Sequence, residues 1–101
     1  MCNMTAQELL NELRKYPKYW AVAYDYERHY MFYVSTIINN YNKSIILSCD
    51  VGIANALTVR QLASKLLKYN LDIPIKVGHR HAYQVDKIKT LFDLVLITTK
   101  W

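Results

Sequence analysis

Two stretches of the chain, 53 residues apart, share one pattern of hydrophobic and polar positions. In each stretch the apolar residues recur at the spacing of one helix face, which predicts helices at about 5–16 and 58–69. Thr5 and Thr58 stand where an N-cap is expected, and a Glu or a Gln three residues later completes a capping box in both. Five of the twelve aligned positions are identical, which indicates an internal duplication.

Short β-rich runs follow each predicted helix in the same order. They lie at 20–24, 32–37 and 44–48 in the first half, and at 73–77, 83–88 and 94–98 in the second half. We therefore predict an α+β fold, with two tandem pseudo-symmetric αβββ-like repeats packed into one compact domain over 1–101. The first repeat covers about 4–50 and the second about 57–101.

The composition and the cysteine count limit the class of protein. With 101 residues, of which 52% are hydrophobic and 21% charged, the chain has the makings of one folded domain and not of a disordered tail. No apolar run approaches the roughly 20 residues that span a bilayer, and no signal peptide pattern opens the chain. We expect a cytoplasmic protein with no membrane partner, in which Cys2 and Cys49 are free thiols.

The net charge of +5 lies in one half of the chain. Residues 1–57 carry five basic and five acidic side chains, whereas residues 58–101 carry eight basic and three acidic ones. A basic second half is compatible with nucleic acid or a phosphorylated nucleotide as a partner, and equally with a solvated surface. The basic residues that suggest such a face are Lys65, Lys68, Lys76, Arg80, Lys87 and Lys89.

Two equivalent turns carry arginine next to histidine. If a pseudo-two-fold arrangement brings both turns to one groove, guanidinium and imidazole groups form an anion-binding site; the other interpretation is a pair of ordinary polar turns. The candidate residues are Arg28, His29, His79, Arg80 and His81. His79 and His81 also have the spacing of two zinc ligands, but no zinc motif supplies the others, so we expect neither a metal nor a cofactor.

Tyrosines are concentrated in the first half of the chain. Some must belong to the core, and the others suit a protein interface, because tyrosine provides contact area at a low entropic cost. The candidate interface residues are Tyr19, Tyr24, Tyr26 and Tyr30. Together with strand edges that we expect to be exposed, they suggest a homodimer or a tight protein partner.

The second predicted unit contains TVRQLASKLLKYNLDIPIKV, HAYQVDKI and LVLIT, and the first contains MTAQELLNELRKYP. This combination resembles a loose pattern of small bacteriophage and prophage proteins: Thr-x-x-Glu/Gln-Leu, a Leu-rich helix with a Tyr or Leu near its end, Asp-x-Pro/Glu-Val and a terminal Val-Val-Leu strand. The resemblance implies a small accessory protein of a mobile element, acting in the host cytoplasm. It carries no functional residues over to this chain.

No Walker loop, dinucleotide fingerprint or nucleophile elbow is present, so we do not expect an enzyme. The leading hypothesis is a non-enzymatic phage-type binding protein that occupies a host protein, for example a host-defence component. The alternative is a binder of nucleic acid or phosphorylated nucleotides through the basic second half. A metal-assisted hydrolase around His79 and His81 is the third hypothesis.

Overall fold

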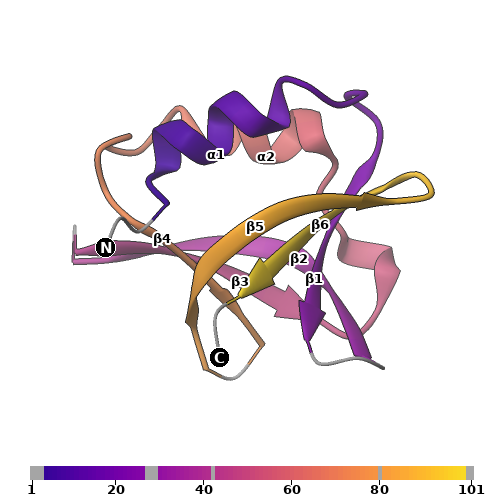
Figure 1. Ribbon diagram of the computed structural model, residues 1–101. Coiled ribbons are helices and arrows are strands. Elements are labelled where there is room, and N and C mark those ends of the chain that lie inside the picture. Colours follow the sequence, from indigo (N-terminus) through magenta and orange to yellow (C-terminus); the bar gives the residue numbers. More distant parts are fainter. Residues whose placement is uncertain (1–3, 27–29, 42, 80, 100–101) are drawn as a thin grey trace.

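Two short helices lie over a six-stranded barrel in the computed structural model, which describes residues 4–26, 30–41, 43–79 and 81–99 (Figure 1). The elements are α1 Ala6–Leu13, β1 Ala21–Tyr26, β2 Tyr30–Asn40, β3 Ser44–Asp50, a 3-10 turn η1 Ile53–Asn55, α2 Val59–Leu66, β4 Ile75–Gly78, β5 Tyr83–Leu91 and β6 Leu94–Thr99. A small domain with two helices and a mixed six-stranded sheet confirms the predicted α+β class.

The sheet closes on itself in the order β1-β2-β3-β4-β5-β6. Neighbours within β1–β3 and within β4–β6 pair antiparallel, while β3 pairs with β4 and β1 with β6 in parallel. The expectation of exposed strand edges is therefore wrong for the described strands. The edges of one three-stranded segment pair with those of the other, and closure leaves no free ladder for edge-to-edge association.

Both predicted capping boxes are present at the helix starts. The Thr5 hydroxyl accepts a hydrogen bond from the Glu8 N–H at 3.2 Å, and the Thr58 hydroxyl accepts one from the Gln61 N–H at 3.2 Å. In each case the N3 side chain accepts the backbone N–H of the cap threonine in return. The free N–H groups of each first turn thus have partners, and this fixes where each helix begins.

The helices end earlier than predicted, at Leu13 and Leu66. Beyond these residues the chain tightens into i to i+3 hydrogen bonds, such as Tyr16 N–H to Leu13 C=O at 3.2 Å and Tyr69 N–H to Leu66 C=O at 3.0 Å. Such tighter turns commonly satisfy the last carbonyls of a helix. No helix in the described ranges is long and apolar enough to span a bilayer.

Each helix start is hydrogen-bonded to the beginning of the first strand of the other half and to the residues just before it. These backbone hydrogen bonds come in matching pairs: Ala6 N–H to Ile73 C=O (2.9 Å) with Val59 N–H to Trp20 C=O (2.8 Å), and Ile75 N–H to Met4 C=O (2.8 Å) with Val22 N–H to Leu57 C=O (3.0 Å). The two halves are therefore interlocked through their backbones and do not pack as separate units.

The core lies between the helices and the inner face of the barrel. The leucines of both helix stripes are completely buried, among them Leu9, Leu13, Leu62 and Leu66, and they join inward-facing strand residues in one cluster. Burying a leucine is worth about 1.5–3 kcal/mol relative to leaving it exposed. The predicted leucine stripes thus provide much of the stabilisation that holds the helices on the barrel.

The middle strands β2 and β5 are longer than the runs predicted for them. Each contains a register shift, between Val34 and Thr36 in β2 and between Val85 and Lys87 in β5. Each leads into a hairpin whose turn holds an aromatic residue with φ of 52°, Tyr41 or Phe92. The bulges increase the local twist, which helps these long strands to curve around the barrel.

Candidate functional site

The predicted anion site falls largely outside the described residues. Arg28, His29 and Arg80 lie there, whereas His79 and His81 are described and exposed, both in the β4–β5 turn. The five-residue anion site therefore stays a prediction. In the described ranges no group of three or more His, Cys, Asp or Glu side chains is arranged to hold a metal ion.

His79 connects the β4–β5 turn to the first half of the molecule. Its ring stacks on Phe32 of β2, with centroids 4.7 Å apart and planes 7° from parallel, and its Nδ1 lies 2.7 Å from the Cys49 carbonyl oxygen. Because a carbonyl oxygen only accepts, Nδ1 carries the proton in this hydrogen bond. The contacts give His79 a structural role in holding the turn against β2 and β3.

The Cys49 thiol is buried beneath this turn. Burial raises its pKa to about 12, and a hydrogen bond from the Gly78 backbone offsets part of that effect. A thiol with so high a pKa stays protonated at neutral pH and is a poor nucleophile or metal ligand. Cys49 is free, as expected, and Cys2 lies outside the described residues.

The four candidate interface tyrosines occupy different environments. Tyr19 is 80% exposed. Tyr24 is completely buried, and its hydroxyl lies 3.2 Å from the Thr99 hydroxyl, so this ring belongs to the core and offers no surface to a partner. Tyr26 and Tyr30 pair across β1 and β2, and their side chains lie outside what the structure describes.

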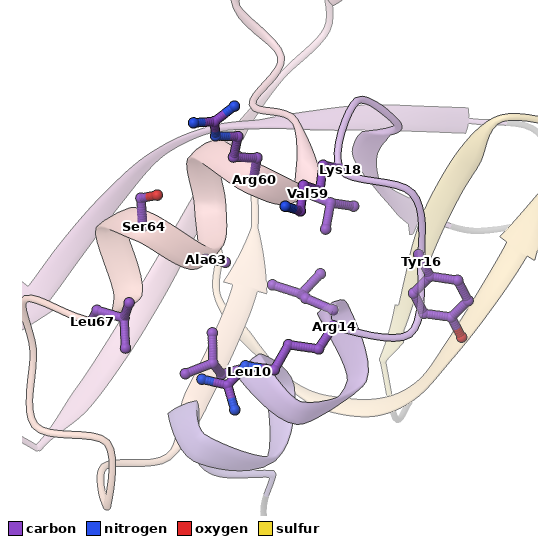
Figure 2. A pocket seen from close by; sticks show the side chains of 10 residues that line it. Leu10, Arg14, Tyr16, Lys18, Val59, Arg60, Ala63, Ser64 and Leu67 are labelled. Carbon is purple, nitrogen blue, oxygen red and sulfur yellow. The ribbon is translucent and has the colours of Figure 1, made fainter.

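A groove of about 330 Å³ lies between α1 and α2 and was not anticipated from the sequence (Figure 2). Its apolar lining comes from both helices: Leu10 and Leu13 from α1, and Val59 and Ala63 from α2. The exposed Leu67 extends this apolar surface beyond the end of α2. A groove of this size is at the lower end of the range of small-ligand sites.

Three cations surround the apolar lining. Arg14 caps the C-terminus of α1, Lys18 lies in the loop before β1, and Arg60 is in the first turn of α2. Figure 2 shows Arg14 on the α1 side of the groove and Arg60 on the α2 side. None of the ten described lining residues is acidic. The groove therefore combines apolar area with an unbalanced positive rim.

Charge counting along the chain missed this rim because the first half is neutral in total. The acids of α1 are engaged elsewhere: Glu8 completes the capping box and Glu12 pairs with Lys15 at 3.2 Å. Neither Glu8 nor Glu12 therefore pairs with Arg14, which lines the groove. A signal was present in the sequence, since Glu8 and Glu12 follow the helix cap at positions that face away from Arg14.

Comparison with known proteins finds no protein family, no curated protein and no solved structure that matches this chain.

Proposed function

We propose that the protein is a non-enzymatic binding protein whose groove between α1 and α2 takes an acidic, amphipathic segment of a partner protein. The observation that carries this proposal is the combination of an apolar lining with Arg14, Lys18 and Arg60 and no carboxylate. An apolar ligand alone leaves the three cations without a counter-charge. A purely ionic ligand leaves the exposed Leu67 side chain at the edge of the groove in water.

The exposure of the cations determines how much they and the apolar residues each contribute to the binding free energy. Arg14, Lys18 and Arg60 are all exposed, so each ion pair with a partner contributes about 0–1 kcal/mol. Cations of this kind mainly accelerate and orient association. The remaining affinity comes from covering the apolar surface that is still exposed at the groove, chiefly Leu67, at about 25 cal/mol per Å², because Leu10, Leu13 and Val59 are already buried. A helix with one apolar face and flanking acids satisfies both requirements.

The partner class rests on the resemblance to small proteins of mobile elements. On that basis the partner is a host protein, for example a host-defence component. A binding role without catalysis is supported by two described side chains of reactive type: the Cys49 thiol is buried and its pKa is raised, and Nδ1 of His79 is hydrogen-bonded to a carbonyl oxygen.

We also propose that the chain is a tandem pseudo-symmetric duplication of one αβββ unit. Matched capping boxes, paired hydrogen bonds from each helix start to the other half, and a register shift in the same place of β2 and β5 support it. The parallel pairings β3–β4 and β1–β6 correspond to one another under the same exchange of halves. The groove then lies where two equivalent helices meet.

Affinity capture from a host lysate tests the binding function. The double variant Arg14→Ala, Arg60→Ala should capture the partner about fivefold less than the unaltered protein, equivalent to about 1 kcal/mol. Lys43→Ala, Lys76→Ala is the matched control, because it removes the same charge from residues that do not line the groove.

Two results would contradict the proposal. Equal capture by the groove variant and the control would remove the groove as the binding site. Recovery of no protein, together with strong 260 nm absorbance of the purified material, would favour the alternative function, binding of nucleic acid or phosphorylated nucleotides.

A further inference from the structure

A second, smaller pocket lies where the end of α2 meets β2. It has a volume of about 180 Å³ and is lined by Thr36, Ile37, Lys65, Lys68 and Tyr69. At roughly 30 Å³ per water molecule, this space corresponds to about six waters. The pocket is separate from the groove between the helices, with which it shares no lining residue.

The two lysines that line this pocket have no acidic partner in the part of the chain that the structure describes. Among the described residues the one ion pair is Glu12 with Lys15, on α1. Lys65 and Lys68 are three residues apart, so they are neighbours on the helix surface and repel each other by a few tenths of a kcal/mol. An anion between them would remove that repulsion.

α1 provides the internal comparison for this pair. Counted from the cap threonine of each helix, Glu12 stands at the position of Lys65, and Lys15 at the position of Lys68. In α1 the pair is an ion pair with 3.2 Å between Lys15 Nζ and Glu12 Oε1. The same helix geometry thus accepts opposite charges, and a lysine at position 65 is not a requirement of the fold.

The helix dipole accounts for one cation near the end of α2, since a positive charge there is worth about 0.3–1 kcal/mol. It does not account for the polar groups opposite the lysines. Thr36 supplies a hydroxyl from β2, and Tyr69 supplies a half-buried phenol that can donate a hydrogen bond. Two ammonium groups and two hydroxyls suit the several oxygens of a tetrahedral oxyanion.

We propose that this pocket is a binding site for a phosphate group, held between the Lys65 and Lys68 ammonium groups with the Thr36 and Tyr69 hydroxyls as further donors. The group is either free phosphate or the phosphate of a small monoester. The pocket volume leaves room for a few atoms beyond the phosphate. The site is independent of partner binding in the groove.

Titration of the ¹⁵N-labelled protein with inorganic phosphate, followed by amide chemical shifts at constant low ionic strength, tests the site. We expect saturable shifts confined to Thr36 and to 65–69, which weaken as chloride is added because salt screens the charges. A second titration with glycerol phosphate separates the two sources: tighter binding than phosphate indicates a monoester, and equal binding indicates the free anion.

Lys65→Glu is the decisive variant, because it installs in α2 the Glu and Lys arrangement that α1 already contains. Its circular dichroism should match that of the unaltered protein, and its phosphate affinity should fall at least tenfold. Lys15→Gln, at the α1 position that matches Lys68, should leave phosphate binding unchanged. Unsaturable shifts spread over all lysines, or equal affinity in Lys65→Glu, would overturn the proposal.

Discussion

The segment from α1 to β3 and the segment from α2 to β6 carry the same structural devices at matching places. Both helices begin with a capping box, both middle strands contain a bulge, and both hairpins turn at an aromatic residue with φ of 52°. These features determine where elements start, bend and reverse. Agreement between the halves therefore identifies positions at which the fold depends on the residue.

The same comparison separates these positions from surface positions at which the halves differ. Counted from the cap threonines, Arg14 matches Leu67, Lys18 matches Leu71, and Arg60 matches Gln7. Arg14 and Arg60 are thus matched by neutral residues, whereas the match of Lys18, Leu71, packs against the core. These cations are therefore the residues that the proposed function assigns to recognition of the partner.

The largest effect is expected where the halves agree in the core. Leu13→Ala and Leu66→Ala should each lower the free energy of unfolding by about 2–5 kcal/mol, because both side chains are completely buried and each truncation leaves a cavity. Urea denaturation measures both. Leu67→Ala is the control and should change stability by less than about 0.5 kcal/mol, because Leu67 is 58% exposed.

If Leu13→Ala and Leu66→Ala lower the free energy of unfolding by unequal amounts, the two helices are not held in the same way. A loss below about 1 kcal/mol for Leu66→Ala, with the full loss for Leu13→Ala, would mean that α2 is held mainly by its backbone bonds and not by its leucine stripe.

The helices, their caps and their buried leucines were predictable because they depend on local spacing. A threonine cap, an N3 side chain and a stripe at helical period are all visible within twelve residues. The order of the strands along the chain was predictable too, although β2 and β5 are longer than the runs predicted for them. Their ends are set by cross-strand pairing, which alternation within one strand does not encode.

Barrel closure and the groove were not predictable because both depend on contacts between distant residues. The parallel pairings of β3 with β4 and of β1 with β6 join residues that share no local signal. The groove brings Arg14 and Arg60 to one site from different halves of the chain. Tyr24 was a candidate for an interface because alternation does not tell which face of a strand points inward.

A smaller effect on the free energy of unfolding is expected at the end of β4, where the two halves carry different residues. Gly78 ends β4, and a Cβ built there would overlap the His81 carbonyl oxygen and lie 2.7 Å from its carbon. Asp25 stands at the matching position of β1, so the equivalent strand position in the first half accepts a side chain. Gly78→Ala should cost about 1–3 kcal/mol in thermal or urea denaturation, because backbone and not a flexible side chain has to move.

Gly52→Ala is the matched control for this turn. Its Cβ would meet nothing within 4 Å, and its φ of −88° and ψ of 147° suit alanine. The variant should be neutral or up to about 1 kcal/mol more stable, since alanine reduces the entropy of the unfolded chain. Equal stability of Gly78→Ala and the unaltered protein would mean that the turn adapts freely, and that the contrast with Asp25 has no structural cause.

The smallest effect on the free energy of unfolding is expected at the capping boxes. Both boxes use the same hydrogen bonds, but the N3 side chain is charged in α1 and neutral in α2. Thr5→Ala and Thr58→Ala should each cost about 1 kcal/mol, because each leaves an N–H of the first helical turn without its acceptor. Denaturation at low and high salt measures the losses. The box of α1 uses the carboxylate of Glu8, whereas that of α2 uses the neutral amide of Gln61.

The charge of Glu8 makes the two boxes distinguishable in the same experiment. A carboxylate in the first turn interacts favourably with the helix dipole and salt screens that interaction, so the stability given by the α1 box should fall at high salt while that given by the α2 box stays constant. Thr5→Ser and Thr58→Ser keep the acceptor oxygen and should retain most of the stability. A loss from Thr58→Ala that depends on salt as strongly as the loss from Thr5→Ala would contradict this assignment, because Gln61 has no charge to screen.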